Sequence, residues 1–317
     1  MSSHALGWGK VILLGEHAVV YGFPALAAAL DRGVSAQALP TPAGGRLRLD
    51  VPAWELATTA SDEHPAGRAL AAIADELGIG RPALTIVAEA QVPPGAGLGS
   101  SAALAVAVTR ALMAHYNRRP DVAALTAAAG AGEIVHHGKP SGIDVAIAIA
   151  GGFGVYRKST GLRAMAAPPL RLLVAPGETQ AIGGSGATEM PRELMRSTAK
   201  MVQHVAEVTH GDPDDPRLRE LGALTDTGAR ALLARDFVGL GAAMNRAHTV
   251  LGDLGVSTQR LDNMCSLARA AGAHGAKLTG AGGGGAVIAL APPDREAAVL
   301  AAWKAAGLAG FAADVGR

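Results

Sequence analysis

Residues 93–103, Pro93-Pro-Gly-Ala-Gly-Leu-Gly-Ser-Ser-Ala-Ala103, place three alternate glycines directly before two serines and an alanine-rich run. Residues 100–117 are rich in Ala, Leu and Val and predict a helix. A glycine-rich turn that enters a helix presents unpaired backbone N–H groups and the positive end of the helix dipole, which together bind phosphate. A simple N-cap at Ser100 would explain one serine but not the whole run. The stretch predicts a phosphate loop, and the missing Gly-Lys-Ser/Thr ending excludes a Walker loop.

The sequence on both sides of this loop predicts strands and helices that mix without a regular order. Hydrophobic patterning predicts strands at 10–14, 46–51, 83–88, 145–149, 153–157, 170–174 and 286–290. It predicts further helices at 64–77, 123–136, 192–209, 216–235, 236–252, 257–271 and 294–306. Because no βαβ unit repeats, the fold class is predicted to be α+β with two lobes rather than a doubly wound sheet. A change of composition after 162–169 predicts lobes at 1–165 and 166–317.

A lysine and an acidic turn frame the first predicted strand. Lys10 begins this apolar strand, and Gly15-Glu16-His17 ends it, which brings a cation and an anion close to one strand. A lysine at a strand edge is more often simply solvated. The pair is therefore a candidate for function only in combination with other charged groups.

Two acidic residues flank the turn Gly138-Lys-Pro-Ser-Gly142. Asp144 follows the turn inside an apolar segment that is predicted as a strand, where a carboxylate is costly unless it is paired or used. Glu133 lies near the end of a predicted helix, where the macrodipole disfavours an anion and a bound cation would offset this. The adjacent His136 and His137 are interpreted as capping or solvated groups, because no third zinc ligand has suitable spacing.

The last glycine cluster, 277–285, begins with Lys277 and matches the dinucleotide-binding pattern G-x-G-x-x-G at Gly280, Gly282 and Gly285. A dinucleotide fold requires a helix directly after these glycines, whereas residues 286–290 predict a strand. The sequence therefore indicates a backbone that approaches the site from the second lobe.

The composition favours a folded protein that holds its ligands by local groups. Of 317 residues 49% are apolar, and a formal net charge of +1 creates no overall field to attract nucleic acid or an anionic membrane. The 42 glycines are roughly twice the usual share. The single Cys265 excludes a disulfide framework, and its helical neighbours predict a packed thiol. The sequence shows no signal-peptide pattern and no membrane-spanning run, so a cytoplasmic location is expected.

Taken together in this order, the glycine motifs resemble those of the GHMP small-molecule kinases. Within that family, 9–22, 93–103, 137–144, 254–258 and 277–285 are similar to the motifs of the mevalonate kinases. The resemblance spans nearly the whole chain. It implies a two-lobed fold with an N-terminal lobe like a small-subunit ribosomal protein, a C-terminal ferredoxin-like α/β lobe, and the active site between them.

The resemblance also implies roles for individual residues, with ATP and Mg²⁺ as cofactors. Asp144 matches the catalytic aspartate that takes or orients the proton of the substrate hydroxyl, and Lys10 matches the lysine that stabilises the developing alkoxide. The Mg²⁺ ligands are matched by Ser101 and Glu133. The ATP phosphates are expected at Pro94, Gly95, Ala96, Gly97, Leu98, Gly99, Ser100 and Ser101. The acceptor, mevalonate, is expected at Glu16, His17, Ser141, Thr188 and Gly282.

Two departures from the family pattern, Lys139 and Val145, lie beside the expected acceptor site. They leave open another kinase of the same fold, acting on phosphomevalonate, homoserine or a sugar. A non-catalytic sensor of ATP and a metabolite is the other alternative, but such a sensor is expected to lose its base or its lysine. The resemblance further implies a monomer or homodimer, a small-molecule substrate, and no nucleic-acid or membrane partner.

Overall fold

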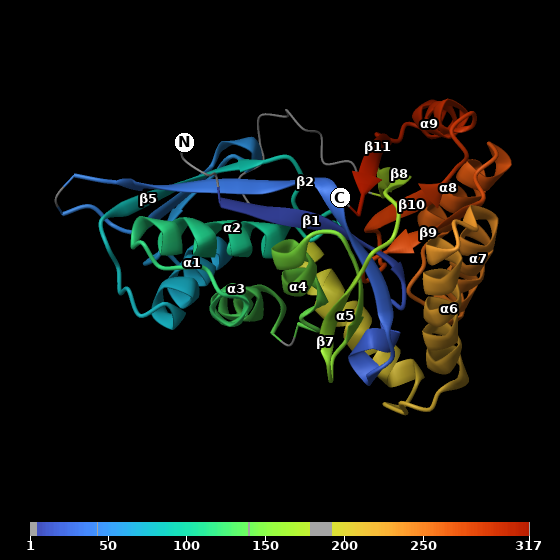
Figure 1. Ribbon diagram of the computed structural model, residues 1–317, viewed down its shortest axis with the longest axis horizontal. Helices are drawn as coiled ribbons and strands as arrows, with labels where there is room; N and C mark the ends of the chain where they lie inside the picture. Colours follow the sequence, from blue (N-terminus) through green and yellow to red (C-terminus); the bar gives the residue numbers. More distant parts are fainter. Residues whose placement is uncertain (1–4, 43, 139, 178–191, 317) are drawn as a thin grey trace.

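The structure, a computed structural model, describes residues 5–42, 44–138, 140–177 and 192–316, with the backbone alone for 192–197 (Figure 1). The N-terminal half of the chain contains β1 (Ala5–Leu14), η1 (Ala18–Tyr21), β2 (Ala25–Pro40), β3 (Arg48–Val51), η2 (Pro52–Trp54), β4 (Leu56–Thr59), α1 (Pro65–Glu76), β5 (Leu84–Ala90), α2 (Ser100–His115), α3 (Val122–His137), α4 (Ile143–Ala150), β6 (Phe153–Arg157) and β7 (Gly161–Met165). The C-terminal half contains β8 (Leu170–Pro176), α5 (Arg192–Val208), α6 (Pro216–Leu233), α7 (Phe237–Asp253), α8 (Gln259–Ala270), β9 (Gly275–Thr279), β10 (Ala286–Leu290), α9 (Glu296–Ala305) and β11 (Phe311–Val315).

One continuous sheet crosses both halves, in the strand order β4-β3-β5-β2-β11-β8-β10-β9. Strand β2 is 16 residues long and also pairs with β1 and β6, so it is the common neighbour of β1, β5 and β6. The last strand of the chain, β11, pairs with β2 at Val315 and Leu30, and Gly316 N donates to Ala29 O at 3.0 Å. Backbone hydrogen bonds therefore connect the two halves directly.

The helices cover the two ends of this sheet separately. Helices α1 and α2 lie against the N-terminal strands, α3 packs on α1 and α2, and α6 to α9 gather beside β8 to β11 (Figure 1). Helix α2 packs on β1 and β2 and is buried on nearly every side, because its Ala, Leu and Val side chains leave no polar face. The core thus fixes the N-terminus of α2, where the phosphate loop ends.

Residues 143–150 form the helix α4, so the predicted strand at 145–149 is wrong. Gly142, at φ +90°, is the N-cap, and Ala146 N donates to Gly142 O at 3.0 Å, which begins the helix. The β-branched side chains of α4 bury against β1 and α2. Their preference for strands is weak and depends on context, so packing overrides it.

The other predicted helices and strands are confirmed with shifted ends, but the prediction lacks the short strands β4, β7, β9 and β11 and the long strand β2. Its first residues, Ala25-Leu-Ala-Ala-Ala-Leu30, are all buried and show no alternation of apolar and polar side chains. Cys265 is fully buried, and burial raises the pKa of its thiol to about 12, which confirms the packed thiol. In the described part of the chain no helix has the length and apolar character to cross a membrane.

Candidate functional site

A cavity of about 750 Å³ lies between the phosphate loop and the glycine cluster of the C-terminal half. The N-termini of α2 and α4 and the C-terminal end of α3 open onto it, and α5 contributes Val202, Gln203 and Ala206. Each wall comes from a different element. The cavity therefore depends on the packing of both halves of the chain.

The phosphate loop reaches the cavity through Gly95, Gly97 and Gly99, whose φ angles are +70°, +75° and +71°. Gly99 is the N-cap of α2, and no side chain accepts a hydrogen bond from the first turn of the helix. The alternative of a simple cap at Ser100 is therefore wrong. A Cβ at Gly99 would lie 2.7 Å from Cγ of Lys10, so only glycine allows this approach. The uncapped N-terminus of a long buried helix is suited to bind an anion.

A lysine and a carboxylate meet at the edge of this cavity. Lys10 Nζ lies 3.1 Å from Asp144 Oδ1, with side-chain exposures of 4% and 33%. Strand β1 positions the lysine, and its backbone N donates to Leu98 O of the phosphate loop at 2.9 Å. Asp144 lies in the first turn of α4, at the positive end of the helix dipole. The pair thus places an available carboxylate and a fixed cation beside the phosphate loop.

A second carboxylate, Glu133 on α3, lines the same cavity but is only 1% exposed. Burial, and then the charge of Asp144, raises its pKa to about 8. Its Oε2 lies 3.6 Å from His137 Nε2, which is 3.3 Å from Ser101 Oγ, whereas Oε1 has no hydrogen-bond partner among the described residues. A buried carboxylate oxygen without a partner, beside a hydroxyl and a second carboxylate, fits a divalent cation that prefers oxygen ligands.

His137 is a site residue that the sequence interpretation missed. Its signal is the i to i+4 spacing from Glu133 on α3, which places both side chains on one helix face. Burial lowers the pKa of His137; the charge of Asp144 opposes this shift, and that of Lys10 adds to it.

The glycine cluster of the C-terminal half forms the opposite wall. Gly280, Gly282, Gly283 and Gly284 all have positive φ, and a Cβ at Gly282 would lie 2.2 Å from the backbone oxygen of Val256. Strand β10 follows directly, which confirms that this cluster is not a dinucleotide-binding turn. A Cβ at Gly280 would lie 3.4 Å from the backbone oxygen of Gly97, so the two glycine loops approach each other closely.

The acidic turn after β1 contributes neither Glu16 nor His17 to the lining of the cavity. Glu16 forms an ion pair with Lys277, and the two side chains are 1% and 0% exposed. His17, at φ +59°, donates from Nε2 to Ala281 O at 3.0 Å, and burial lowers its pKa to about 4. Both residues thus contact the C-terminal half of the chain.

The predicted site residues divide between the cavity and the packed interior. Those that line the cavity are Lys10, Gly95, Gly97, Gly99, Ser100, Ser101, Glu133, Ser141, Asp144 and Gly282. Those outside its lining are Glu16, His17, Pro94, Ala96 and Leu98. Thr188 and Lys139 lie outside the described residues.

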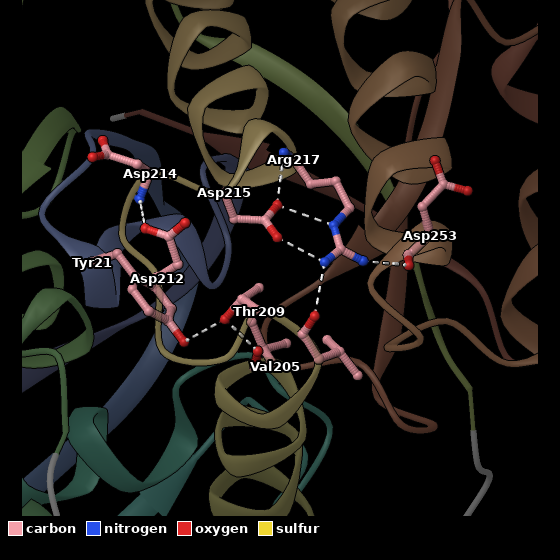
Figure 2. A network of polar contacts seen from close by, with 9 residues as sticks. Tyr21, Val205, Thr209, Asp212, Asp214, Asp215, Arg217 and Asp253 are labelled. Atoms are coloured by element: carbon pink, nitrogen blue, oxygen red, sulfur yellow. Dashed lines mark hydrogen bonds and ion pairs between the residues drawn. The ribbon is translucent and has the colours of Figure 1, made fainter.

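A polar network fixes the C-terminal end of α5, the helix that forms one side of the cavity (Figure 2). Thr209 Oγ1 lies 3.3 Å from the Tyr21 hydroxyl of η1. Arg217, at the start of α6, donates to Val208 O at 3.0 Å, and its guanidinium is held by Asp215 at 2.7 Å. The helix is thereby attached to both halves of the chain at the end away from residue 192.

Comparison with known proteins gives the same family from sequence and from structure. Residues 64–152 match the GHMP kinases N terminal domain, and residues 229–309 match the GHMP kinases C terminal model. The mevalonate kinase of Thermococcus sibiricus is 35% identical over 94% of this chain and 91% of its own length. That of Methanothermobacter thermautotrophicus is 36% identical over 96% of each. The crystal structure of L. major mevalonate kinase in complex with R-mevalonate superposes with a TM-score of 0.82 at 28% identity, covering 99% of this chain and 96% of that one.

Proposed function

The chain belongs to the GHMP kinase family, and from this premise we propose that it transfers the γ-phosphoryl group of ATP to the primary hydroxyl of mevalonate. The Lys10–Asp144 pair carries the proposal, because it lies beside the uncapped N-terminus of α2 in a cavity that both halves build. Phosphoryl transfer needs positioning and charge stabilisation more than covalent chemistry, and these groups supply both.

The proposed reaction assigns one task to each side chain. The Asp144 carboxylate accepts or orients the proton of the acceptor hydroxyl, and the alcohol oxygen forms a bond to the γ-phosphorus. The bond between the γ-phosphorus and the oxygen that bridges to the β-phosphate breaks, and ADP leaves. The Lys10 ammonium stabilises the negative charge on the acceptor oxygen as the proton is lost.

Mg²⁺ is proposed as the cofactor cation, with Ser101 and Glu133 as the residues that would hold it. The unpartnered Oε1 of Glu133 and the raised pKa of this carboxyl support the assignment, because a cation would offset the cost of burying its charge. A cation held there would supply positive charge to offset the charge of the phosphates. The ATP phosphates are proposed to bind the backbone of the loop from Pro94 to Ser101.

The acceptor is proposed to lie between α4, α5 and the glycine cluster. Ser141 and Gly282 supply polar contacts there, and Val20, Val145 and Val202 form an apolar wall. That wall suits the methyl-bearing carbon chain of mevalonate better than a sugar, whose hydroxyls would lose their hydrogen bonds to water against it. The intact Lys10–Asp144 pair argues against a non-catalytic sensor.

Three coarser features complete the proposal. The division into lobes at 1–165 and 166–317 agrees with one family match on each side of the boundary. We place the enzyme in the cytoplasm, where its phosphoryl donor ATP is made available. We also propose a monomer or a homodimer, as the family resemblance implies.

An assay of ADP release across several alcohols tests this function. The purified chain is supplied with MgATP and, separately, with mevalonate, phosphomevalonate, homoserine or galactose. We expect turnover with mevalonate and not with the others. Turnover with a different alcohol alone would replace the acceptor, and ATP binding without turnover on any alcohol would favour the sensor.

A further inference from the structure

A buried ion pair joins the two halves of the chain at a place that the proposed reaction does not use. Glu16 follows β1 and Lys277 lies within β9, and the two residues are 261 positions apart in the sequence. Neither side chain lines the cavity, and at most 1% of either side chain is exposed to solvent. Among the described residues, no hydrogen bond links either side chain to Lys10, Asp144 or Glu133.

The hydrogen bonds and the burial of the pair restrict the relative position of its two side chains. Lys277 Nζ donates to Glu16 Oε1 and to the backbone oxygen of Leu278, the latter at 2.5 Å, and Glu16 Oε2 has no hydrogen-bond partner among the described residues. Burial raises the pKa of Glu16 and lowers that of Lys277, while each partner opposes the shift in the other. Among the described residues, Lys10 and Cys265 also affect the pKa values of the pair, and Lys277 in turn lowers the pKa of His17 and of His248.

Further hydrogen bonds join the same two segments, β1 with the turn after it and β9 with the residues after it. We call this contact between the two halves the seam. Thr279 Oγ1 accepts from Ile12 N at 2.9 Å and donates to Ile12 O at 3.0 Å. His17 Nε2 donates to Ala281 O at 3.0 Å. The contacts on the C-terminal side thus occur at alternate positions, 277, 279 and 281, and they lead directly into the glycine cluster of the cavity. On the N-terminal side they begin two residues after Lys10.

Stability alone does not explain such a pair. The desolvation of two charges commonly outweighs their attraction, so an apolar pair of the same volume would hold the seam as well or better. An ion pair differs because each charge has only one partner available, which disfavours a shifted register between the two segments. Apolar side chains would tolerate such a shift.

We propose that Glu16 and Lys277 are positioning residues, which hold the C-terminal glycine cluster against Lys10 so that the phosphates meet the acceptor in a reactive alignment. The proposal rests on the proposed function. The pair touches neither ATP nor the acceptor; it acts through the segment Thr279–Ala281 and through His17. The family resemblance implies that Glu16 contacts the acceptor; its proposed role is instead to align the two segments.

The test compares single and double neutral variants. Lys277→Met and Glu16→Gln each leave one buried charge without its partner, so both are expected to lower the urea midpoint of unfolding. The double variant Glu16→Gln/Lys277→Met leaves no unpaired charge and is expected to regain the midpoint. Its kcat is nevertheless expected to stay on the order of 10–100-fold below wild type, with both KM values within about threefold, because misalignment affects the chemical step more than binding. The double variant Glu220→Gln/Arg246→Met, which removes an exposed pair between α6 and α7, is the matched control and should match wild type in kcat.

Recovery of both the midpoint and kcat in the double variant would overturn the proposal, because the pair would then only support folding. If the neutral variants do not fold, Glu16→Asp takes their place: it keeps the charge but withdraws the carboxylate by one methylene. A lowered kcat in this variant supports alignment, and a wild-type kcat contradicts it. All rates are measured with the alcohol that the wild type phosphorylates and are expressed relative to wild type. If mevalonate is not that alcohol, the proposed function fails while the test of the ion pair is unaffected.

Discussion

Two lysine–carboxylate pairs lie at opposite ends of one short stretch of chain, and they differ chiefly in their access to solvent. Lys10 meets Asp144 at the cavity, where the carboxylate is 33% exposed. Six positions later, Glu16 meets Lys277 with exposures of 1% and 0%. Both pairs join a lysine to a carboxylate, but only the first carboxylate is accessible to solvent.

In the roles proposed above, solvent access rather than residue type separates the pair that takes part in the reaction from the pair that aligns the chain. A carboxylate that opens on the cavity can exchange a proton with a bound alcohol, and the lysine paired with it is proposed to stabilise the transition state. A sealed carboxylate has no such path, and its pairing can only fix the relative position of two segments. Disrupting the first pair should reduce turnover, whereas disrupting the second should reduce stability as well.

The largest effect is expected from Asp144→Asn, which removes the open carboxylate without changing its shape. Turnover should fall on the order of 10²–10⁴, the usual scale for loss of a general base, and the urea midpoint should stay near wild type. Steady-state kinetics and urea unfolding measure the two quantities. Asp226→Asn, at an exposed site on α6, is the matched control. Near-normal turnover in Asp144→Asn would remove the assignment of the base.

The next effect separates the two lysines by stability. Lys277→Met should lower the free energy of unfolding by about 3–5 kcal/mol, because it leaves a carboxylate buried and unpaired. Lys10→Met should cost less, because its partner Asp144 is partly exposed and can regain water. Urea unfolding of both variants at one pH gives the comparison. Equal losses would mean that exposure does not distinguish the pairs.

A smaller effect is expected where the cavity pair borders the proposed cation site. Ser101→Ala should raise the KM for MgATP by roughly tenfold, the lower end of the range for altered metal-site residues, with a smaller change in kcat. The measurement is a titration of MgATP at saturating acceptor. Thr126→Ala, on an exposed part of α3, is the control. A change in acceptor KM alone would place Ser101 in a different role.

The last prediction concerns an effect that is absent at neutral pH and develops only on acidification, at a buried histidine without an ion-pair partner. Burial lowers the pKa of His136 to about 4, from its ordinary value of 6.5. Its folded pKa lies below the unfolded one, so its contribution to stability is full above about pH 6.5 and is lost as pH falls towards 4. His136→Leu should therefore gain stability relative to wild type on acidification, by up to ~1.4 kcal/mol per pH unit in this window.

Urea unfolding at several pH values between 7.5 and 4.5 measures this slope. His17 and His248 have pKa values lowered to about 4 as well, so wild type is expected to remain acid-sensitive after the loss of His136. The exposed His115 is the control, and His115→Gln should leave the slope unchanged. An unchanged slope in His136→Leu would show that folding does not lower the pKa of this ring.

The sequence by itself determined the chemistry of the cavity. Alternate glycines before a helix indicate an anion site wherever they occur, because the exposed N–H groups and the dipole are local properties. An acidic residue in an apolar segment signals use for the same local reason, so Asp144 could be chosen before its structure was known. The family motifs then assigned partners to these residues by resemblance.

Only the tertiary structure decided which of these groups face the cavity. Residues 143–150 form a helix because of the contacts of their side chains with β1 and α2, and short-range propensity does not contain those contacts. Glu16 finds Lys277 across 261 positions of sequence, a pairing that exists only after both halves have packed. The sequence shows which side chains can carry charge and hold phosphate. The assembly of the whole chain determines which of these charges are buried. In the roles proposed here, an accessible charge takes part in the reaction and a buried one only positions the chain.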